Sequence, residues 1–270
     1  MGEGMGNESQ LMPYISSANI SCGFHAGNVD ILKRTIELAL ENNVAVGAHP
    51  GYPDRENFGR VSQMISLLDM AELIAEQIYA FEKVAIPLGA KMHHIKLHGA
   101  LYNDCAKDAA LSKIFIQTIQ AIDTGIIIYA LSGSKTIEEA KKLGQPYASE
   151  AFADRTYQWD GNLTPRYLDQ AMIDNVEEAC QQVLDIIQLQ KVNTLQGEPI
   201  DIDADTICIH GDGLQAIEFA KAIHTTLKKH QIEINFYNLY KGLQVTYILE
   251  TEDVHKIIKI LQEQINKIKL

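Results

Sequence analysis

The alternation of strand-like and helical patterns along the chain is the feature that most restricts its fold. Each of six strand-like segments is followed by a helical pattern or by a long loop. Such alternation predicts parallel strands joined by helical crossovers. The strand-like segments lie at 14–21, 44–49, 91–98, 125–134, 146–155 and 206–213, and the helical patterns at 29–41, 66–85, 107–122, 135–143, 167–189 and up to 229.

The turns after these strands favour one kind of α/β fold over another. No G-x-G-x-x-G or G-x-x-x-x-G-K-[ST] turn follows any strand, so the sequence carries neither a dinucleotide nor a P-loop fingerprint. We therefore expect a β/α barrel and not an open, doubly wound sheet. One or two further strands (at 234–240 and 243–250) and then an amphipathic helix are predicted in the last segment.

The composition of the chain restricts its partners and its location. The 35 Asp and Glu residues outnumber the 23 Lys and Arg residues, and the net charge of −12 argues against nucleic acid or an anionic membrane surface as the main partner. The four cysteines form no CxxC pair, so neither a zinc ribbon nor a disulfide framework is indicated. The N-terminal residues do not resemble a signal peptide, and no apolar run reaches the roughly 18 residues of a membrane span. We expect a cytoplasmic protein.

Polar residues share one face of the strand-like segment that begins at residue 91, KMHHIKLHGALYN. His94, Lys96 and His98 are spaced two residues apart, with Ile95 and Leu97 between them. In a strand, such residues point to the same side of the sheet. An unpaired buried lysine is costly, so this face is either a solvated edge or part of a polar site.

The other strands also end in polar residues, and this repetition favours a polar site. The active site of a β/α barrel lies at the carboxyl ends of its strands. Each strand-end residue alone has an ordinary structural explanation, such as a surface ion pair between Asp154 and Arg155. Together they predict one functional mouth that contains Asn19, His25, His49, Lys96, His98, Ser132, Ser134, Asp154, Arg155, His210 and Asp212.

The residue types in this mouth allow more than one chemistry. Histidines with carboxylates bind divalent metals such as Zn²⁺, or they transfer protons near neutral pH. The spacing leaves both possibilities open, since no HxxxH or HExxH occurs. Lys96 and Arg155 suit a carboxylate or a phosphate group.

Five blocks of the sequence, in order, resemble the LamB/YcsF (lactam utilisation) family: SSANISCGFHAGN, GAHPGYPD, HIKLHGALYN, EAFADRTYQWDGNLTPR and ICIHGD. The resemblance implies an irregular seven-stranded β/α barrel of the glycoside hydrolase/deacetylase type, over residues 1–232. It also implies the role of the A subunit in an ATP-dependent 5-oxoprolinase, which opens 5-oxoproline to L-glutamate together with partner subunits B and C. Residues 233–270 are then a C-terminal extension without an assigned role.

The chain departs from the family pattern at its start. Family members usually begin with a strand of the type D-x-N-x-D-x-G-E, of which only Gly2 and Glu3 match here. We therefore expect the first barrel strand to be missing, together with acidic groups that would face the mouth.

The leading hypothesis assigns roles to eight of the candidate residues, with ATP as co-substrate. Catalytic residues are Lys96, His98, Asp154 and His210, and substrate-binding residues are Asn19, His49, Arg155 and Asp212. Two alternatives stay open at this stage. One is a metal-dependent, deacetylase-like amidohydrolase that acts alone, with His25 and His49 as ligands of a divalent metal. The other is a non-catalytic subunit that supports its partners.

Overall fold

The computed structural model describes residues 1–213, 215–237, 255–256 and 258–262. At its centre lies a six-stranded, curved sheet with the strand order β1-β2-β3-β4-β5-β8, and every neighbouring pair is parallel. This arrangement confirms the predicted β/α architecture. The strands are β1 (Ser17–Ser21), β2 (Ala45–His49), β3 (Met92–Lys96), β4 (Ile127–Leu131), β5 (Tyr147–Phe152) and β8 (Thr206–Cys208).

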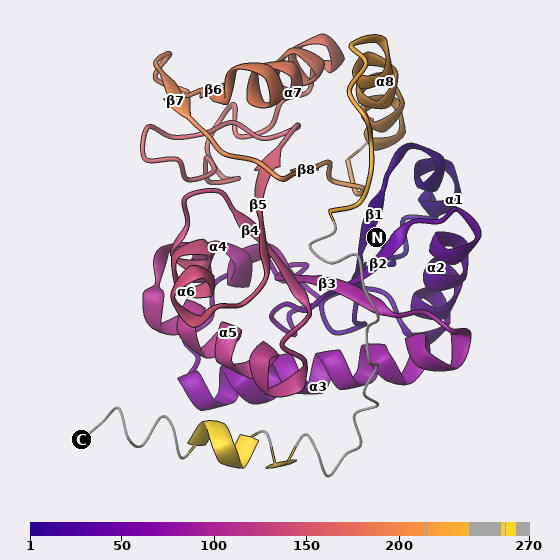
Figure 1. The fold of residues 1–270 in the computed structure, drawn as a ribbon, viewed down its shortest axis with the longest axis vertical. Helices are drawn as coiled ribbons and strands as arrows, with labels where there is room; N and C mark the ends of the chain where they lie inside the picture. The colour runs from indigo at the N-terminus through magenta and orange to yellow at the C-terminus, as the bar shows by residue number, and fades with distance from the viewer. Residues whose placement is uncertain (214, 238–254, 257, 263–270) are drawn as a thin grey trace.

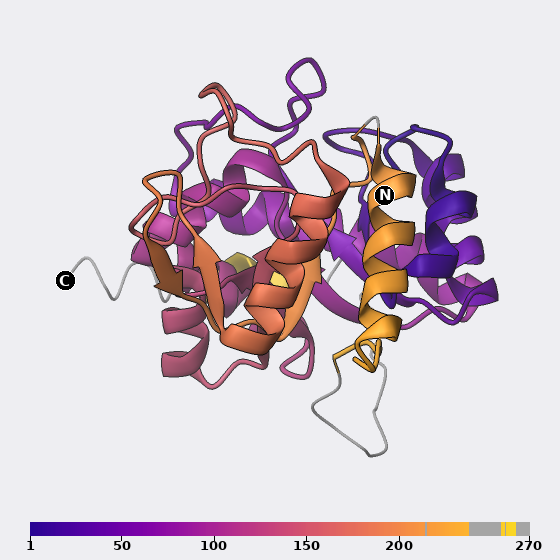
Figure 2. The same cartoon turned by 90° about the horizontal axis from the view of Figure 1, so that it is seen from above.

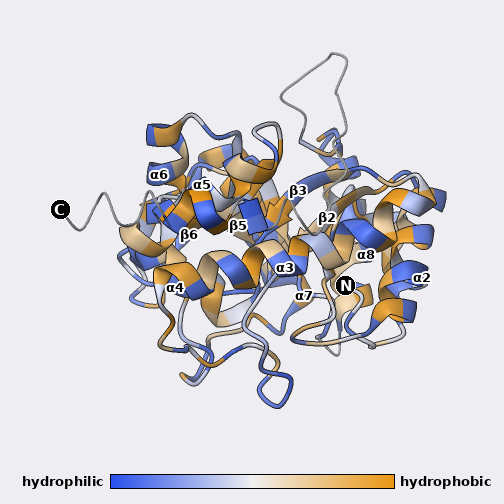
Figure 3. Cartoon of the chain, turned by 90° about the horizontal axis from the view of Figure 1, so that it is seen from below, coloured by the Kyte–Doolittle hydropathy of each residue, from blue (hydrophilic) through white to orange (hydrophobic). Residues whose placement is uncertain are grey.

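Helices surround this half-barrel on its outer side (Figures 1 and 2). Their apolar sides face the sheet and their polar sides face outward, as the banded colouring of α3 in Figure 3 shows. The α-helices are α1 (Glu8–Leu11), α2 (Val29–Glu41), α3 (Leu67–Ala85), α4 (Gly99–Lys107), α5 (Ala109–Ile122), α6 (Lys135–Leu143), α7 (Val176–Leu189) and α8 (Ala216–Lys229), and two 3₁₀ turns lie at η1 (Met12–Tyr14) and η2 (Ile86–Leu88).

Two helices whose positions were predicted correctly, α2 and α3, begin at clear N-caps. The side chain of Asn28 accepts a hydrogen bond from the backbone N–H of Ile31 (2.9 Å), and α2 begins at the next residue. Ser66 accepts in the same way from the N–H of Asp69 (3.1 Å) at the start of α3. Both helices could therefore be predicted from the sequence, because each has a capping side chain directly before an amphipathic pattern.

The helix predicted over 107–122 is confirmed by α5, which begins two residues later, but α4, directly after β3, was not predicted. Gly99 takes a left-handed φ of 57° and starts α4 directly after β3. Asp108 then ends α4 and caps α5 by accepting from Ala110 and Leu111. His98 consequently stands at the N-cap position of α4 and not inside the strand as predicted.

The helix predicted over 167–189 is also too long. Asn175 caps α7 by accepting from the N–H of Glu178 (2.9 Å), so the helix begins at Val176. The residues before it form an irregular loop, and a short antiparallel hairpin of β6 (Lys191–Asn193) and β7 (Pro199–Asp201) follows α7. This hairpin was not predicted from the sequence.

The last segment is only partly described. Residues 234–237 are not in a strand, contrary to prediction, and the rest of the predicted strand segments lies outside the described residues. Residues 255–256 and 258–262 are helical, as predicted. Among the helices that the structure describes, none is both long enough and apolar enough to cross a membrane.

The first residues of the chain lie along the outer edge of β1, where the resemblance led us to expect a missing strand. The N–H of Ser21 donates to the carbonyl of Met1 (2.9 Å), and the Met1 amino group donates to the carbonyl of Asn19 (3.1 Å). Glu3 is thereby brought to the mouth of the half-barrel, where it lines the central cavity.

The inner face of the sheet is polar at several levels. At the lowest level His94 contacts Asn19 (Nε2 to Oδ1, 3.0 Å) and stacks on Tyr129 at 4.1 Å between ring centroids. The imidazole fits there because Gly47 has no side chain: a Cβ at that position would overlap the His94 ring. Lys96 and then His98 follow further along the same face.

Gly47→Ala should destabilise the fold by about 1–3 kcal/mol, since the methyl group would displace a fully buried imidazole. Urea unfolding measures this change. Gly213→Ala is the matched control, because a Cβ there meets no atom within 4 Å and φ is not left-handed. Equal stability of the two variants would contradict the packing described for His94.

The buried carboxyl of Glu82 on α3 should make the free energy of unfolding depend on pH. Its Oε2 is buried without a hydrogen-bond partner among the described residues, and burial, with Asp123 nearby, raises its pKa to about 7. Because the unfolded carboxyl ionises near pH ~4.3, the free energy of unfolding should fall as the pH rises from about 4 to 7. Glu82→Gln should therefore be more stable than the wild type at pH 8 and equal to it near pH 4. Equal stability at both values would contradict this account.

Candidate active site

A cavity of about 390 Å³ opens at the carboxyl end of the sheet. Four of the strand-end residues predicted to converge do not line this cavity. Asp154 and His25 contact lining residues from behind, namely His210 and His98. Ser132 and Ser134 are the other two. Ser134 instead caps α6 by accepting from Ile137. The predicted convergence is thus confirmed for the seven residues that line the cavity: Asn19, His49, Lys96, His98, Arg155, His210 and Asp212.

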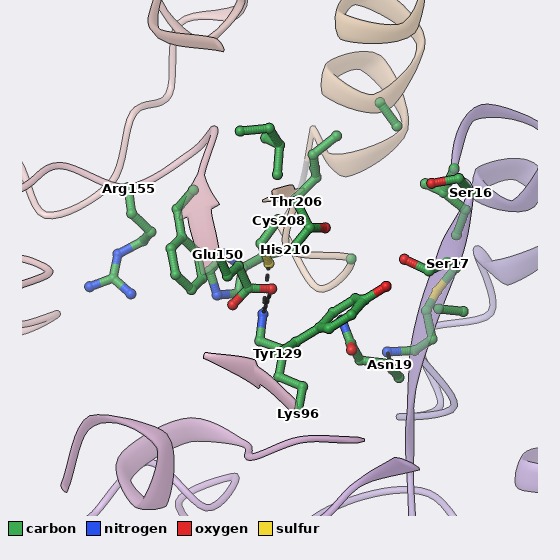
Figure 4. A pocket seen from close by; sticks show the side chains of 18 of the residues that line it. Ser16, Ser17, Asn19, Lys96, Tyr129, Glu150, Arg155, Thr206, Cys208 and His210 are labelled. Atoms are coloured by element: carbon green, nitrogen blue, oxygen red, sulfur yellow. Dashed lines mark hydrogen bonds and ion pairs between the residues drawn. The ribbon is translucent and has the colours of Figure 1, made fainter. Parts of the chain in front are cut away.

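A buried ion pair forms the floor of the cavity (Figure 4). The ammonium of Lys96 on β3 lies 2.7 Å from Glu150 Oε1 on β5 and 3.1 Å from Cys208 Sγ on β8. Tyr102 from α4 donates to the second oxygen of Glu150 (2.8 Å). Lys96 and Glu150 are 5% and 1% exposed, so nearly all their stabilisation comes from each other and from these neighbours.

The surroundings keep Lys96 charged. Burial alone would lower its pKa, but the Glu150 carboxylate and the hydrogen bonds to Glu150 and Cys208 raise the pKa above its ordinary value. The Phe152 ring lies 4.8 Å from the ammonium and adds a cation–π contact. Burial also raises the pKa of Cys208 to about 12, so the thiol is neutral and donates or accepts only weakly.

A second pair, Asp154 and His210, lies beside this floor. Nδ1 of His210 is 2.9 Å from Asp154 Oδ1, and the backbone N–H of His210 donates to Oδ2 of the same carboxylate (3.0 Å). Burial would raise the pKa of Asp154, but His210 lowers it below its ordinary value, so the carboxylate stays ionised. Since Asp154 accepts the proton of Nδ1, Nε2 of the neutral ring is an acceptor, and His210 lines the cavity.

Two further histidines meet at the rim. His98 Nδ1 lies 3.1 Å from His49 Nε2, and Glu3 Oε1 is 3.9 Å from the same His98 nitrogen. Burial, followed by the neighbouring His25, lowers the pKa of His98 to about 3. Burial and His98 lower the pKa of His49 in the same way. Both rings are therefore neutral at pH 7.

Other predicted residues have structural partners that the sequence did not indicate. Arg155 donates to the backbone carbonyls of Ala171 and Thr164, so its guanidinium holds the loop before α7. In Figure 4 it is turned away from the Lys96 cluster. Asp212 accepts a hydrogen bond from Arg60, an exposed pair at the rim. The substrate-binding roles assigned to these residues stay predictions.

Several residues of the site were not predicted from the sequence. A carboxylate inside the otherwise apolar strand YASEAF was the one available signal, because a charged residue in a buried strand needs a partner. The side chains of the other missed residues gave no such signal, since the fold alone brings them to the cavity. The missed residues are Glu3, Arg60, Tyr102, Glu150, Arg166 and Cys208.

The fold and the cavity define an α/β half-barrel protein with a polar site at the carboxyl ends of its strands. The sequence model of the LamB/YcsF family matches residues 1–241. The chain belongs to this family, which confirms the resemblance found in the sequence.

Relatives and a solved structure agree with this assignment. The chain is 48% identical over 234 residues to a protein of Shouchella clausii named as the A subunit of 5-oxoprolinase, covering 87% of this chain and 92% of the relative. A protein of Tolumonas auensis with the same name is 44% identical over 230 residues, covering 85% and 92%. The crystal structure of a lactam utilization protein from Thermus thermophilus superposes with a TM-score of 0.80 at 34% identity, covering 86% of this chain and 93% of that one.

Glu150→Gln should destabilise the protein by about 3–5 kcal/mol, because it leaves the buried Lys96 ammonium without its counter-charge. Glu138→Gln is the control, since it removes an ion pair of α6 with Lys135 that is largely solvated. Urea unfolding of both variants at pH 7 measures the difference. A loss below about 1 kcal/mol for Glu150→Gln would show that the pair is not the dominant interaction of the floor.

Proposed function

We propose that this chain is the A subunit of an ATP-dependent 5-oxoprolinase and that its cavity binds the lactam. Its relatives at 48% and 44% identity bear the name of the 5-oxoprolinase A subunit, and that name supports the proposal. The reaction opens the cyclic amide of 5-oxoproline to L-glutamate, with ATP hydrolysis. Subunits B and C are the proposed partners.

The cavity offers charges that complement 5-oxoproline, a small molecule with a carboxylate and a lactam. Arg166 and Arg60 both line its outer part. Arg60 is paired with Asp212, whereas Arg166 has no carboxylate within ion-pair distance among the described residues and donates to the sulfur of Met172. We assign the substrate carboxylate to Arg166, which takes over the role that the sequence analysis gave to Arg155.

Lys96 is suited to the lactam oxygen. Its ammonium has three N–H donors, and Glu150 and Cys208 take two of them. The third is left for a ligand in the cavity that Lys96 lines. A fixed ammonium in a site shielded from water stabilises negative charge that develops on a carbonyl oxygen.

The Asp154–His210 pair is the single observation that carries the catalytic proposal. Asp154 fixes the tautomer of His210, so Nε2 faces substrate as a base and can later return the proton to the leaving lactam nitrogen. A lactam is a stabilised amide. ATP is therefore assigned to phosphorylate its carbonyl oxygen, with ADP as the leaving group. Water then attacks the carbonyl carbon under general-base catalysis by His210, and the C–N bond breaks as the nitrogen takes the proton. Hydrolysis of the resulting acyl phosphate releases phosphate and L-glutamate.

His210→Gln should lower the rate of ATP-coupled 5-oxoproline turnover in the complex with subunits B and C by about 10²–10⁴-fold. His230→Gln is the control, since His230 follows α8 on the surface. The assay measures glutamate and ADP formation with and without each of the two partners.

The assay also separates the alternative functions. Unchanged turnover in His210→Gln would contradict the proposed role and favour a non-catalytic subunit that supports its partners. Hydrolysis by the isolated chain without ATP, if abolished by a chelator, would favour the metal-dependent amidohydrolase that acts alone.

A further inference from the structure

Three potential ligand atoms face one another at the rim of the cavity: His49 Nε2, His98 Nδ1 and a carboxylate oxygen of Glu3. The three atoms all lie within 4.8 Å of one another. The two nitrogens are 3.1 Å apart, and the Glu3 oxygen is 3.9 Å from that of His98. Ligands at about 2.0–2.1 Å from a tetrahedral zinc ion lie about 3.3–3.4 Å from one another, so small side-chain shifts would complete such a site.

The hydrogen bonds on the far side of each ring determine which nitrogens hold protons. His49 Nδ1 is 2.7 Å from the carbonyl of Lys96, and His98 Nε2 is 2.7 Å from the carbonyl of Phe58. A carbonyl only accepts, so each of these nitrogens carries its proton. In the neutral rings, each of the two nitrogens that face each other therefore carries a lone pair, and no N–H group lies between them.

Two facing lone pairs beside a carboxylate repel one another unless a cation lies between them. We propose that Glu3, His49 and His98 bind one divalent cation of the zinc class. Two imidazoles and one carboxylate form a donor set that Zn²⁺ favours, and their outer hydrogen bonds to carbonyls are typical of metal-binding histidines. All three residues line the cavity, so the remaining coordination position faces the space assigned to substrate.

His25 has a supporting place in this site. Its Nε2 lies 3.3 Å from Glu3 Oε1, and its ring stacks on His98 at 3.8 Å between centroids with an angle of 4°. It thus orients one ligand and packs against another. The proposal accordingly replaces the pair His25 and His49, expected from the sequence, by His49, His98 and Glu3. A metal here would polarise a carbonyl oxygen or activate water.

Metal content tests this proposal independently of the proposed reaction. Untagged full-length protein is stripped with a chelator, dialysed against micromolar Zn²⁺ and analysed by mass spectrometry for metal per chain. We expect about one Zn²⁺ per chain, and a Co²⁺-loaded sample should show the visible absorption of cobalt bound by nitrogen and oxygen ligands. Less than about 0.1 metal per chain in the wild type would overturn the proposal.

Variants assign the ligands. His49→Gln, His98→Gln and Glu3→Gln should each weaken zinc binding at least about 100-fold by competition with a chromogenic chelator, and His25→Phe, which keeps the stack, about 10-fold. His230→Gln should bind as the wild type does. Circular dichroism checks that each variant is folded, and zinc should raise the unfolding temperature of the wild type but not of the ligand variants. Wild-type affinity in folded His98→Gln or Glu3→Gln would overturn the ligand assignment.

Discussion

The ion pair between Lys96 and Glu150 is the interaction on which the interior of the half-barrel depends. Both groups are almost completely removed from water, so each needs the other as well as the hydrogen bonds of Cys208 and Tyr102. These four residues come from β3, α4, β5 and β8, and their pairing therefore requires the strands to lie in the observed order and register. A polar interior of this kind is costly for stability, and such a cost is typical of a site retained for function.

The levels of the inner face differ in how far their polar groups are hydrogen-bonded within the protein. At the lowest level His94 contacts Asn19 and Tyr129 and fills the interior, and both of its ring nitrogens have partners within the protein. The next level holds a charged lysine with one donor left over. At the rim, His49 and His98 present lone pairs to each other. One Lys96 donor and two imidazole lone pairs are thus left for a ligand in the cavity.

Much of the fold was predictable from local signals, whereas the pairing of side chains was not. Asn28 and Ser66 marked α2 and α3, because a cap and an amphipathic pattern both act over a few residues. His98 was placed in the strand because its spacing from Lys96 fits a strand as well as the N-cap that it occupies. The partner of Lys96 could not be chosen from the sequence, since Glu150 is 54 residues away and their contact depends on strand order. The acceptors of Arg155 could not be predicted for a similar reason, because they belong to an irregular loop with no periodic pattern.

The central claim is that this cavity binds the lactam with its oxygen at Lys96. A crystal structure of the protein with 5-oxoproline tests it most directly. The account predicts the lactam oxygen within about 3 Å of Lys96 Nζ, the carboxylate at Arg166 and the lactam nitrogen on the side of His210. A bound 5-oxoproline elsewhere on the protein, with the cavity beside Lys96 holding only water, would contradict it.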